Sequence, residues 1–195
     1  MIEKEVLEKL YVKKKKSVAE ISHLTSWSQT AVNYWLFEHG IPKRSISEAI
    51  YVKRNPKGDP FVVERPKSID QAVLYGLGLG LYWGEGNKKN KMSIKLGNTD
   101  PKLVKKFIAF MEQSFKIERK KLRFGLQVFS DMSKTRVLNF WVKELSFPRT
   151  QFQQVVITKS RGMGTYKNKT QYGVLTVYYN NKKLRDILCQ TIEKL

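Results

Sequence analysis

The stretch QAVLYGLGLGLYWGEG, residues 71–86, organises the larger part of this chain. It carries one formal charge, at Glu85, and a glycine recurs every four residues at Gly76, Gly80 and Gly84. Glycine inside a helix costs ~1 kcal/mol relative to alanine, so a helix that needed only burial would avoid it. Residues four apart share one helix face, so these glycines predict a bare stripe that a second backbone can approach closely.

The other positions of this helix are mostly leucines and aromatic residues, which we expect to bury into a core. The uncharged run over residues 71–84 is shorter than the ~20 residues needed to span a bilayer, so no membrane association is expected. Glu85 stands where the helix should end, before Gly86, and its carboxylate faces the negative end of the helix dipole. A divalent cation would hold the carboxylate there. An ion pair with a nearby lysine is the structural alternative.

The segment GLGLYWGEG, residues 78–86, resembles the LAGLIDADG motif of homing endonucleases and their relatives. In this alignment Gly80 matches the first glycine of the motif, Gly84 its small seventh position, Glu85 the catalytic acid and Gly86 the final glycine. Trp83 stands where the family often has an acid, and residues 78–79 replace the first Leu-Ala pair. The small residues and the acid, which are the essential parts of the motif, are present.

The resemblance implies a homodimer, because one motif per chain supplies half of a double-stranded DNA endonuclease. The motif helices of two chains would pair through Gly76, Gly80 and Gly84. Glu85 and the carbonyl of Gly84 would bind Mg2+ or Mn2+. With one such site from each chain, the dimer would hydrolyse both DNA strands. A lysine near the site assists in the family, and the sequence offers Lys95 and Lys159 on different predicted strands.

Composition agrees with a polyanionic partner. The 195 residues carry 37 basic and 17 acidic side chains, a net charge of +20. Residues 1–60 hold 11 basic and 7 acidic residues (+4), and residues 61–195 hold 26 and 10 (+16). Such an excess favours nucleic acid, although a ribosome-associated or merely basic protein would also show it. The single cysteine, Cys189, indicates a reducing compartment, so we expect a cytoplasmic, nucleoid-associated protein.

The first fifty residues predict three short helices, at residues 2–12, from residue 18 to a turn at 25–27, and at 29–37. They resemble a helix-turn-helix DNA-binding domain. Ser17 with Glu20 has the spacing of a capping box, and the usual turn leucine and glycine are replaced by Thr25 and Ser26. The third helix would enter the major groove. A three-helix packing module without DNA contact is the alternative. The residues expected to bind DNA here are Ser28, Gln29, Thr30, Asn33, Tyr34, Lys43 and Arg44.

Residues 51–67 contain three prolines and many basic side chains, which is typical of an interdomain linker. From residue 68 the chain alternates between helix and strand patterns, with strands expected at 91–97, 122–129, 153–159 and 172–179. Helices on one face of a mainly antiparallel sheet define an α+β fold. The resemblance implies an αββαββα-like LAGLIDADG saddle over residues 68–195. The polar residues expected on its DNA-facing side are Lys91, Ser93, Lys95, Arg123, Gln127 and Arg161.

Two classes of function follow. The first is a site-specific, metal-dependent DNA endonuclease acting as a homodimer, which the retained Glu85 favours. The second is a non-cleaving transcriptional regulator on the same scaffold. It is favoured by the N-terminal domain that resembles a helix-turn-helix and by Trp83, which stands where the family often has an acid. An RNA maturase is a third role found in the family.

Overall fold

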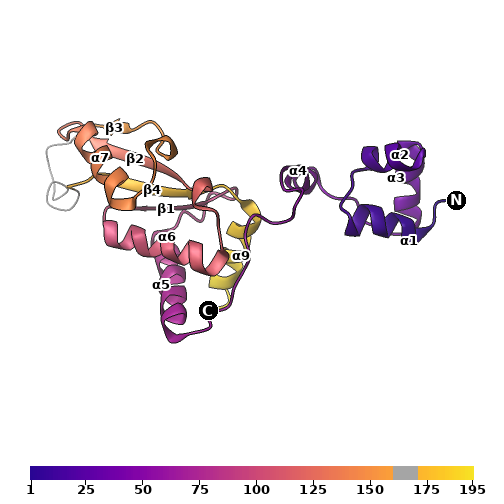
Figure 1. The fold of residues 1–195 in the computed structure, drawn as a ribbon, viewed down its shortest axis with the longest axis horizontal. Helices are drawn as coiled ribbons and strands as arrows, with labels where there is room; N and C mark the ends of the chain where they lie inside the picture. The colour runs from indigo at the N-terminus through magenta and orange to yellow at the C-terminus, as the bar shows by residue number, and fades with distance from the viewer. Residues whose placement is uncertain (160–170) are drawn as a thin grey trace. The chain divides into compact units, whose positions relative to one another are not determined.

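The computed structural model describes residues 1–159 and 171–195. The chain divides into two compact units, Met1–Pro60 and Phe61–Leu195 (Figure 1). Its described residues form eight α-helices and an open, mixed, four-stranded sheet, which confirms the predicted α+β class. In the same residues, no helix is both long and apolar enough to cross a membrane.

The N-terminal unit contains the three predicted helices. Helix α1 (Lys4–Leu7) continues into a π-helical segment, η1 (Glu8–Lys13), and is followed by α2 (Val18–Thr25) and α3 (Gln29–Glu38). The predicted capping box at Ser17 is confirmed, since its hydroxyl accepts from the Glu20 N–H and Glu20 accepts from the Ser17 N–H. The core of the unit consists of Ile2, Leu7, Tyr11, Ile21, Val32, Leu36 and Ile41.

The turn between α2 and α3 has the backbone conformation for which glycine is usual. Ser26, which follows α2, has φ of 59°, in the left-handed region that costs a residue with a side chain ~1–2 kcal/mol. Ser28 then caps α3, because its side chain accepts from the Ala31 N–H at 3.1 Å. The left-handed position of this turn is therefore occupied by a serine, where glycine would be free of strain.

A fourth helix, α4 (Ile46–Arg54), was not predicted, and it extends into the segment expected to be a linker. Its signal was present in the sequence, because Ser45 and Glu48 cap its first turn reciprocally. At the other end of that segment Phe61 is buried in the C-terminal unit, and the Val62 N–H donates to the Phe115 carbonyl at 2.9 Å. The irregular connection is thus shorter than residues 51–67.

The C-terminal unit places its helices on one four-stranded sheet. The strands lie in the order β1-β4-β2-β3; β4 is antiparallel to both of its neighbours, and β3 is parallel to β2. The elements in chain order are α5 (Ile69–Glu85), β1 (Ile94–Asn98), α6 (Pro101–Phe115), the 3-10 turn η2 (Arg119–Lys121), β2 (Arg123–Phe129), α7 (Lys134–Leu145), the 3-10 turn η3 (Arg149–Gln151), β3 (Val156–Thr158), β4 (Val174–Tyr179) and α9 (Lys182–Ile192).

The element order departs from the αββαββα pattern that the resemblance implied. Helix α6 separates β1 from β2, and α7 separates β2 from β3. The cause is local: Asp100 caps α6 by accepting from the Lys102 N–H, Pro101 occupies its first turn, and the helix buries one apolar face. What the structure retains is an α+β unit that begins with the glycine-rich helix.

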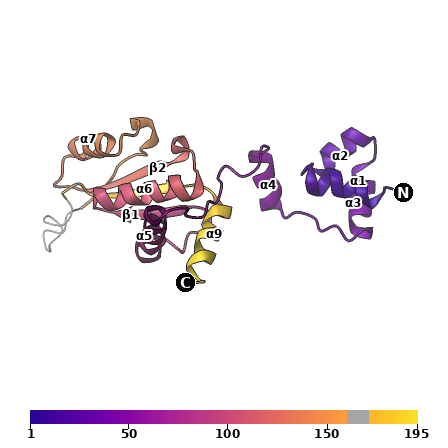
Figure 2. The same ribbon diagram turned by 60° about the horizontal axis from the view of Figure 1, so that its bottom comes forward.

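One face of the sheet builds the core, as the alternation in the sequence predicted. The inward side chains of β2 (Phe124, Leu126 and Val128) are at most 2% exposed. The inward residues of β1 and β4 join them in one cluster with the apolar faces of the helices. Helix α5 packs chiefly against α6 in the helical layer (Figure 2), so one of its sides is turned away from the core.

Candidate functional site

The glycines of α5 fall into two groups according to what faces them. A Cβ atom placed on Gly78 would stand 2.0 Å from Cγ of Phe110, so only glycine lets α6 come this close. At Gly76, Gly80 and Gly84, apart from the adjacent residues and the backbone of α5 itself, no atom of the described chain lies within 4 Å of the same position. Within residues 1–159 and 171–195, no other element therefore packs against the predicted glycine stripe.

Apolar side chains flank this stripe and are unusually exposed. Ile69 is 83% exposed, Val73 63% and Trp83 56%, and Leu77 also lies partly open. We call the surface made by these side chains and by the three glycines the open face of α5. Single exposed apolar residues are common on protein surfaces, whereas large contiguous apolar patches often belong to interaction sites.

The C-terminal end of α5 is fixed to the sheet by backbone contacts. The Gly86 N–H donates to the Tyr82 carbonyl at 2.9 Å, and a Cβ atom on Gly86 would stand 2.3 Å from that same oxygen. Gly86 then forms an antiparallel bridge with Leu96, and the Asn87 N–H donates to the Lys95 carbonyl at 2.9 Å. The glycine at this position therefore lets the chain turn directly from the helix onto the edge strand β1.

Glu85 is the last residue of α5 and its side chain is exposed. Within the residues that the structure describes, its carboxylate has no ion pair or hydrogen bond. The nearby ammonium group of Lys88 instead donates to the Trp83 carbonyl, where it satisfies one of the free carbonyls at the end of the helix. The alternative, in which Glu85 forms an ion pair with a neighbouring lysine, is therefore not observed among the described residues.

The two lysines proposed as catalytic assistants lie at opposite edges of the sheet. Lys95 is on β1, beside the residues that follow Glu85, and its Nζ stands 5.2 Å from the ring centre of Tyr178. Lys159 follows β3, which is three strand positions away from β1, or about 14 Å at the usual spacing. Only Lys95 therefore lies on the strand next to Glu85.

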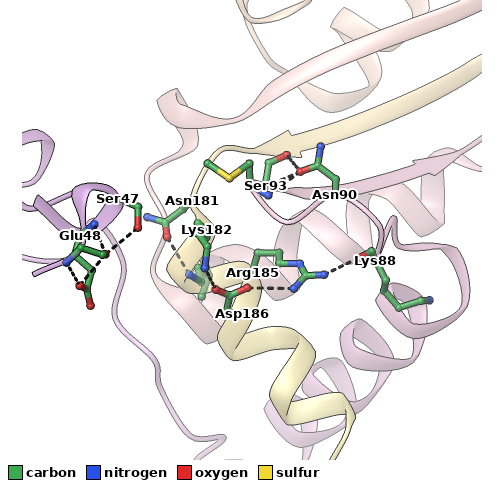
Figure 3. A network of polar contacts seen from close by, with 12 residues as sticks. Ser47, Glu48, Lys88, Asn90, Ser93, Asn181, Lys182, Arg185 and Asp186 are labelled. Atoms are coloured by element: carbon green, nitrogen blue, oxygen red, sulfur yellow. Dashed lines mark hydrogen bonds and ion pairs between the residues drawn. The ribbon is translucent and has the colours of Figure 1, made fainter. Parts of the chain in front are cut away.

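Helix α9 supports the loop that follows the glycine helix (Figure 3). The guanidinium group of Arg185 donates to the Lys88 carbonyl at 2.5 Å and to Asp186 at 3.1 Å, and only 13% of its side chain is exposed. Asp186 also accepts from Lys182 at 2.6 Å. Because Lys88 in turn binds the Trp83 carbonyl, α9 helps to hold the helix end that carries Glu85.

Tyr82 lies on the inner side of this helix end. Its side chain is fully buried and stacks on Phe107, with 6.2 Å between the ring centres. Its hydroxyl oxygen and the Arg185 Nε are buried without a hydrogen-bond partner in the described part of the chain. Burial raises the pKa of Tyr82 to about 12. The phenol therefore stays protonated wherever the protein is folded at ordinary pH.

The outer face of the sheet carries part of the predicted polar set. Lys95, Tyr178 and Arg123 form one cross-strand row, and the Tyr178 ring lies against Gly125, where a Cβ atom would stand only 2.9 Å from the ring. Gln127, exposed on β2, donates its amide to Thr158 at 2.8 Å. The guanidinium group of Arg123 donates to the carbonyls of its neighbours Lys120 and Leu122.

Three other predicted DNA-binding positions have different outcomes. Lys91 is exposed. Ser93 is 4% exposed and its hydroxyl donates to Asn90 at 3.2 Å, so the expectation that it faces outward is wrong. It precedes β1 in a loop organised by Asn90, where strand alternation does not apply. Arg161 lies outside the described residues.

In the N-terminal unit the third helix exposes most of its predicted reading residues. Gln29, Thr30 and Tyr34 are exposed and Asn33 is partly exposed. The hydroxyl of Ser28, which is exposed, is engaged as the helix cap.

The two basic residues that follow α3 differ in their surroundings. Lys43 is exposed. Arg44 stacks on the Tyr11 ring at 4.2 Å and donates to the carbonyls of Lys15 and Lys16, so its guanidinium group has a structural role within the unit.

The part of the chain that the structure describes brings no three His, Cys, Asp or Glu side chains together as a metal site. Glu85 supplies one exposed carboxylate, and Mg2+ is commonly held by one or two carboxylates with water and substrate phosphates. A magnesium ion at Glu85 would therefore need further ligands from water, a nucleic acid or a second copy of the chain.

Comparisons of the chain with protein-family models, with curated proteins and with solved structures found no match.

Sequence reasoning missed two features of this region. The first is the close packing of Gly78 against Phe110. Its signal in the sequence was that Gly78 does not fall in the four-residue spacing of Gly76, Gly80 and Gly84. The second is the contact of Arg185 with the Lys88 carbonyl, which joins residues 97 positions apart and has no local signal.

Proposed function

We propose that this chain is a site-specific, metal-dependent double-stranded DNA endonuclease of the LAGLIDADG type that acts as a homodimer. The observation that carries the proposal is the exposed Glu85 carboxylate, which has no partner among residues 1–159 and 171–195 and ends a helix whose glycine-lined side is open. A second copy packed on the open face of α5 would bring two such carboxylates close together. Like charges that close favour a bound cation between them.

The chemistry follows from the groups at the end of the helix. A divalent ion held by Glu85 and the Gly84 carbonyl would activate water and stabilise the leaving oxygen of a phosphodiester. Lys95, on the neighbouring strand, would be the assisting lysine. The row of Lys95, Tyr178 and Arg123 on the outer sheet face would lie along the DNA, and the net charge of +20 would hold the phosphate backbone.

Cleavage of a plasmid library, or of the DNA that flanks the gene, in Mg2+ or Mn2+ tests this proposal. The Glu85→Gln variant keeps the shape of the side chain and removes its charge, so it should lose cleavage by several orders of magnitude. Its duplex binding should change little or tighten as carboxylate repulsion disappears. Asp70→Asn, in the first turn of the same helix, is the matched control and should cleave normally. A Glu85→Gln protein that cuts at the wild-type rate would refute the mechanism.

A non-cleaving DNA-binding regulator is the second candidate. It is favoured by the exposed Trp83 beside Glu85, at a position where the family often has an acid, and by the exposed polar residues of α3. In that case wild type and Glu85→Gln would be equally inert towards DNA and would bind it alike, so the same assay distinguishes the two functions.

A further inference from the structure

Helix α3 presents an unusual combination of side chains on its exposed side. Val32 and Leu36 are completely buried on the inner side. Thr30, Asn33, Tyr34 and Phe37 have the spacing i, i+3, i+4 and i+7, which places them in one stripe along the helix. We call these four residues the α3 stripe.

Phe37 is the most exposed aromatic residue of this stripe. It is 78% exposed, and Tyr34 is 55% exposed, so neither ring is explained by the core of its own unit. Glu38, the only acidic residue in α3, is a single position further along and therefore points about 100° away from Phe37. The α3 stripe thus presents the amide of Asn33, the hydroxyl of Thr30 and two aromatic rings, and none of its four residues is acidic.

These groups match the major-groove edge of an A·T pair. An asparagine amide bonds adenine at N6 and N7, and an apolar ring or a threonine methyl contacts the 5-methyl group of thymine. A protein interface would use the rings but would have to bury the Asn33 amide. The basic segment at residues 13–16 and the exposed Lys43 belong to the same unit and supply charge of the sign that phosphates require.

We propose that α3 reads A·T pairs in the major groove, with Asn33 bonding an adenine and Phe37 packing on the methyl group of a thymine. Phe37 is then a specificity determinant of the DNA target. This inference rests on the proposed DNA-binding function. It adds which base pairs the N-terminal unit recognises in the DNA target.

The test begins with the target itself. Duplexes selected from a random pool by the full chain give the preferred site, and each thymine in that site is then replaced in turn by deoxyuridine, which lacks only the 5-methyl group. For wild type, one or two replacements should weaken binding about fourfold each, as expected for one buried methyl-sized group. Phe37→Ala should bind the thymine and uracil duplexes equally at those positions.

Two further variants sharpen the test. Asn33→Ala should lose the preference for adenine at a neighbouring position. Val12→Ala removes another exposed apolar residue of the same unit, lying outside α3, and should keep the wild-type response to deoxyuridine. Because Phe37 is 78% exposed, its replacement should leave the unit folded, which circular dichroism checks.

The outcomes separate this inference from the proposed function. Selective duplex binding without any thymine-to-uracil difference, or a difference that persists in Phe37→Ala, would overturn the inference and leave DNA binding standing. A Phe37→Ala protein that binds DNA normally but changes its oligomeric state would assign the ring to a protein interface and also overturn it. Absence of duplex binding by wild type would refute both.

Discussion

The two sides of helix α5 contain the same kind of residue in opposite environments. Gly78 is buried, with the Phe110 ring where a side chain would start. At Gly76, Gly80 and Gly84, no other element of the described chain comes within 4 Å of that position. On the first side glycine is required by the fold of the chain itself. On the other side it has no such requirement, although each glycine still costs helix stability. This difference is the reason for proposing that the second set contacts a second copy of the chain.

The largest effect is expected at Gly78. Gly78→Ala introduces a methyl group at 2.0–2.4 Å from the Phe110 ring atoms, so α5 and α6 must move apart. Overpacking of this kind should cost about 3 kcal/mol of unfolding free energy, measured by urea denaturation. Combining Gly78→Ala with Phe110→Leu should recover part of the loss. Normal stability of Gly78→Ala alone would show that this contact does not define the packed side.

A smaller loss is expected at Arg185, which holds the end of α5 through Lys88. Arg185→Ala removes two hydrogen bonds from a mostly buried guanidinium group and should lower the unfolding free energy by about 2 kcal/mol. Amide exchange should rise in residues 86–93, which follow the helix. Lys182→Ala is the control, because its ion pair with Asp186 is more exposed and should contribute less than about 1 kcal/mol.

The packed side should also respond to alkaline pH. Burial raises the pKa of Tyr82 from 10.0 to about 12. Below pH 10 the phenol is protonated in both the folded and the unfolded states, so its contribution to stability is constant. Between pH 10 and 12 only the unfolded state releases the proton, so stability falls as pH rises. Urea denaturation of wild type against Tyr82→Phe measures this, and an identical pH dependence of the two would contradict it.

The smallest effect, of opposite sign, is expected on the open face. The methyl group of Gly80→Ala meets no other element of the described chain, so a monomeric form should gain the helix propensity of alanine, about 0.5–1 kcal/mol. Urea denaturation under dilute conditions that favour the monomer measures this gain. If Gly80→Ala destabilised the monomer, Gly80 would be packed within the chain as Gly78 is, and the contrast between the two sides of α5 would be wrong.

The sequence was sufficient to predict most elements of the fold. Periodicity and caps identified the three N-terminal helices, the glycine-rich helix and the four strands of the C-terminal unit, since these signals are local. Helix α4 was missed because the prolines after it suggested a linker, although the capping box of Ser45 and Glu48 was visible. Ser93 was assigned to the outer face by alternation, but it lies before β1 begins.

The candidate site was less predictable, because its parts meet through long-range packing. The sequence predicted the glycine stripe from spacing, and it pointed to Glu85 through its place at the helix end and the resemblance to the LAGLIDADG motif. It could not choose between Lys95 and Lys159, because that choice depends on the strand order, which places one beside α5 and the other at the opposite edge. Nor could it predict that Arg44 would be used inside its own unit.

Sedimentation velocity at tens of micromolar tests most directly the claim that the open face of α5 pairs two chains. Wild type, with and without duplex DNA, should sediment as a species of twice the 22.8 kDa chain mass. Gly80→Leu should be folded and monomeric, whereas Lys106→Leu, which adds the same side chain on the exposed surface of α6, should stay dimeric. A wild-type protein that remains monomeric even on DNA, or a Gly80→Leu protein that remains dimeric, would contradict the account.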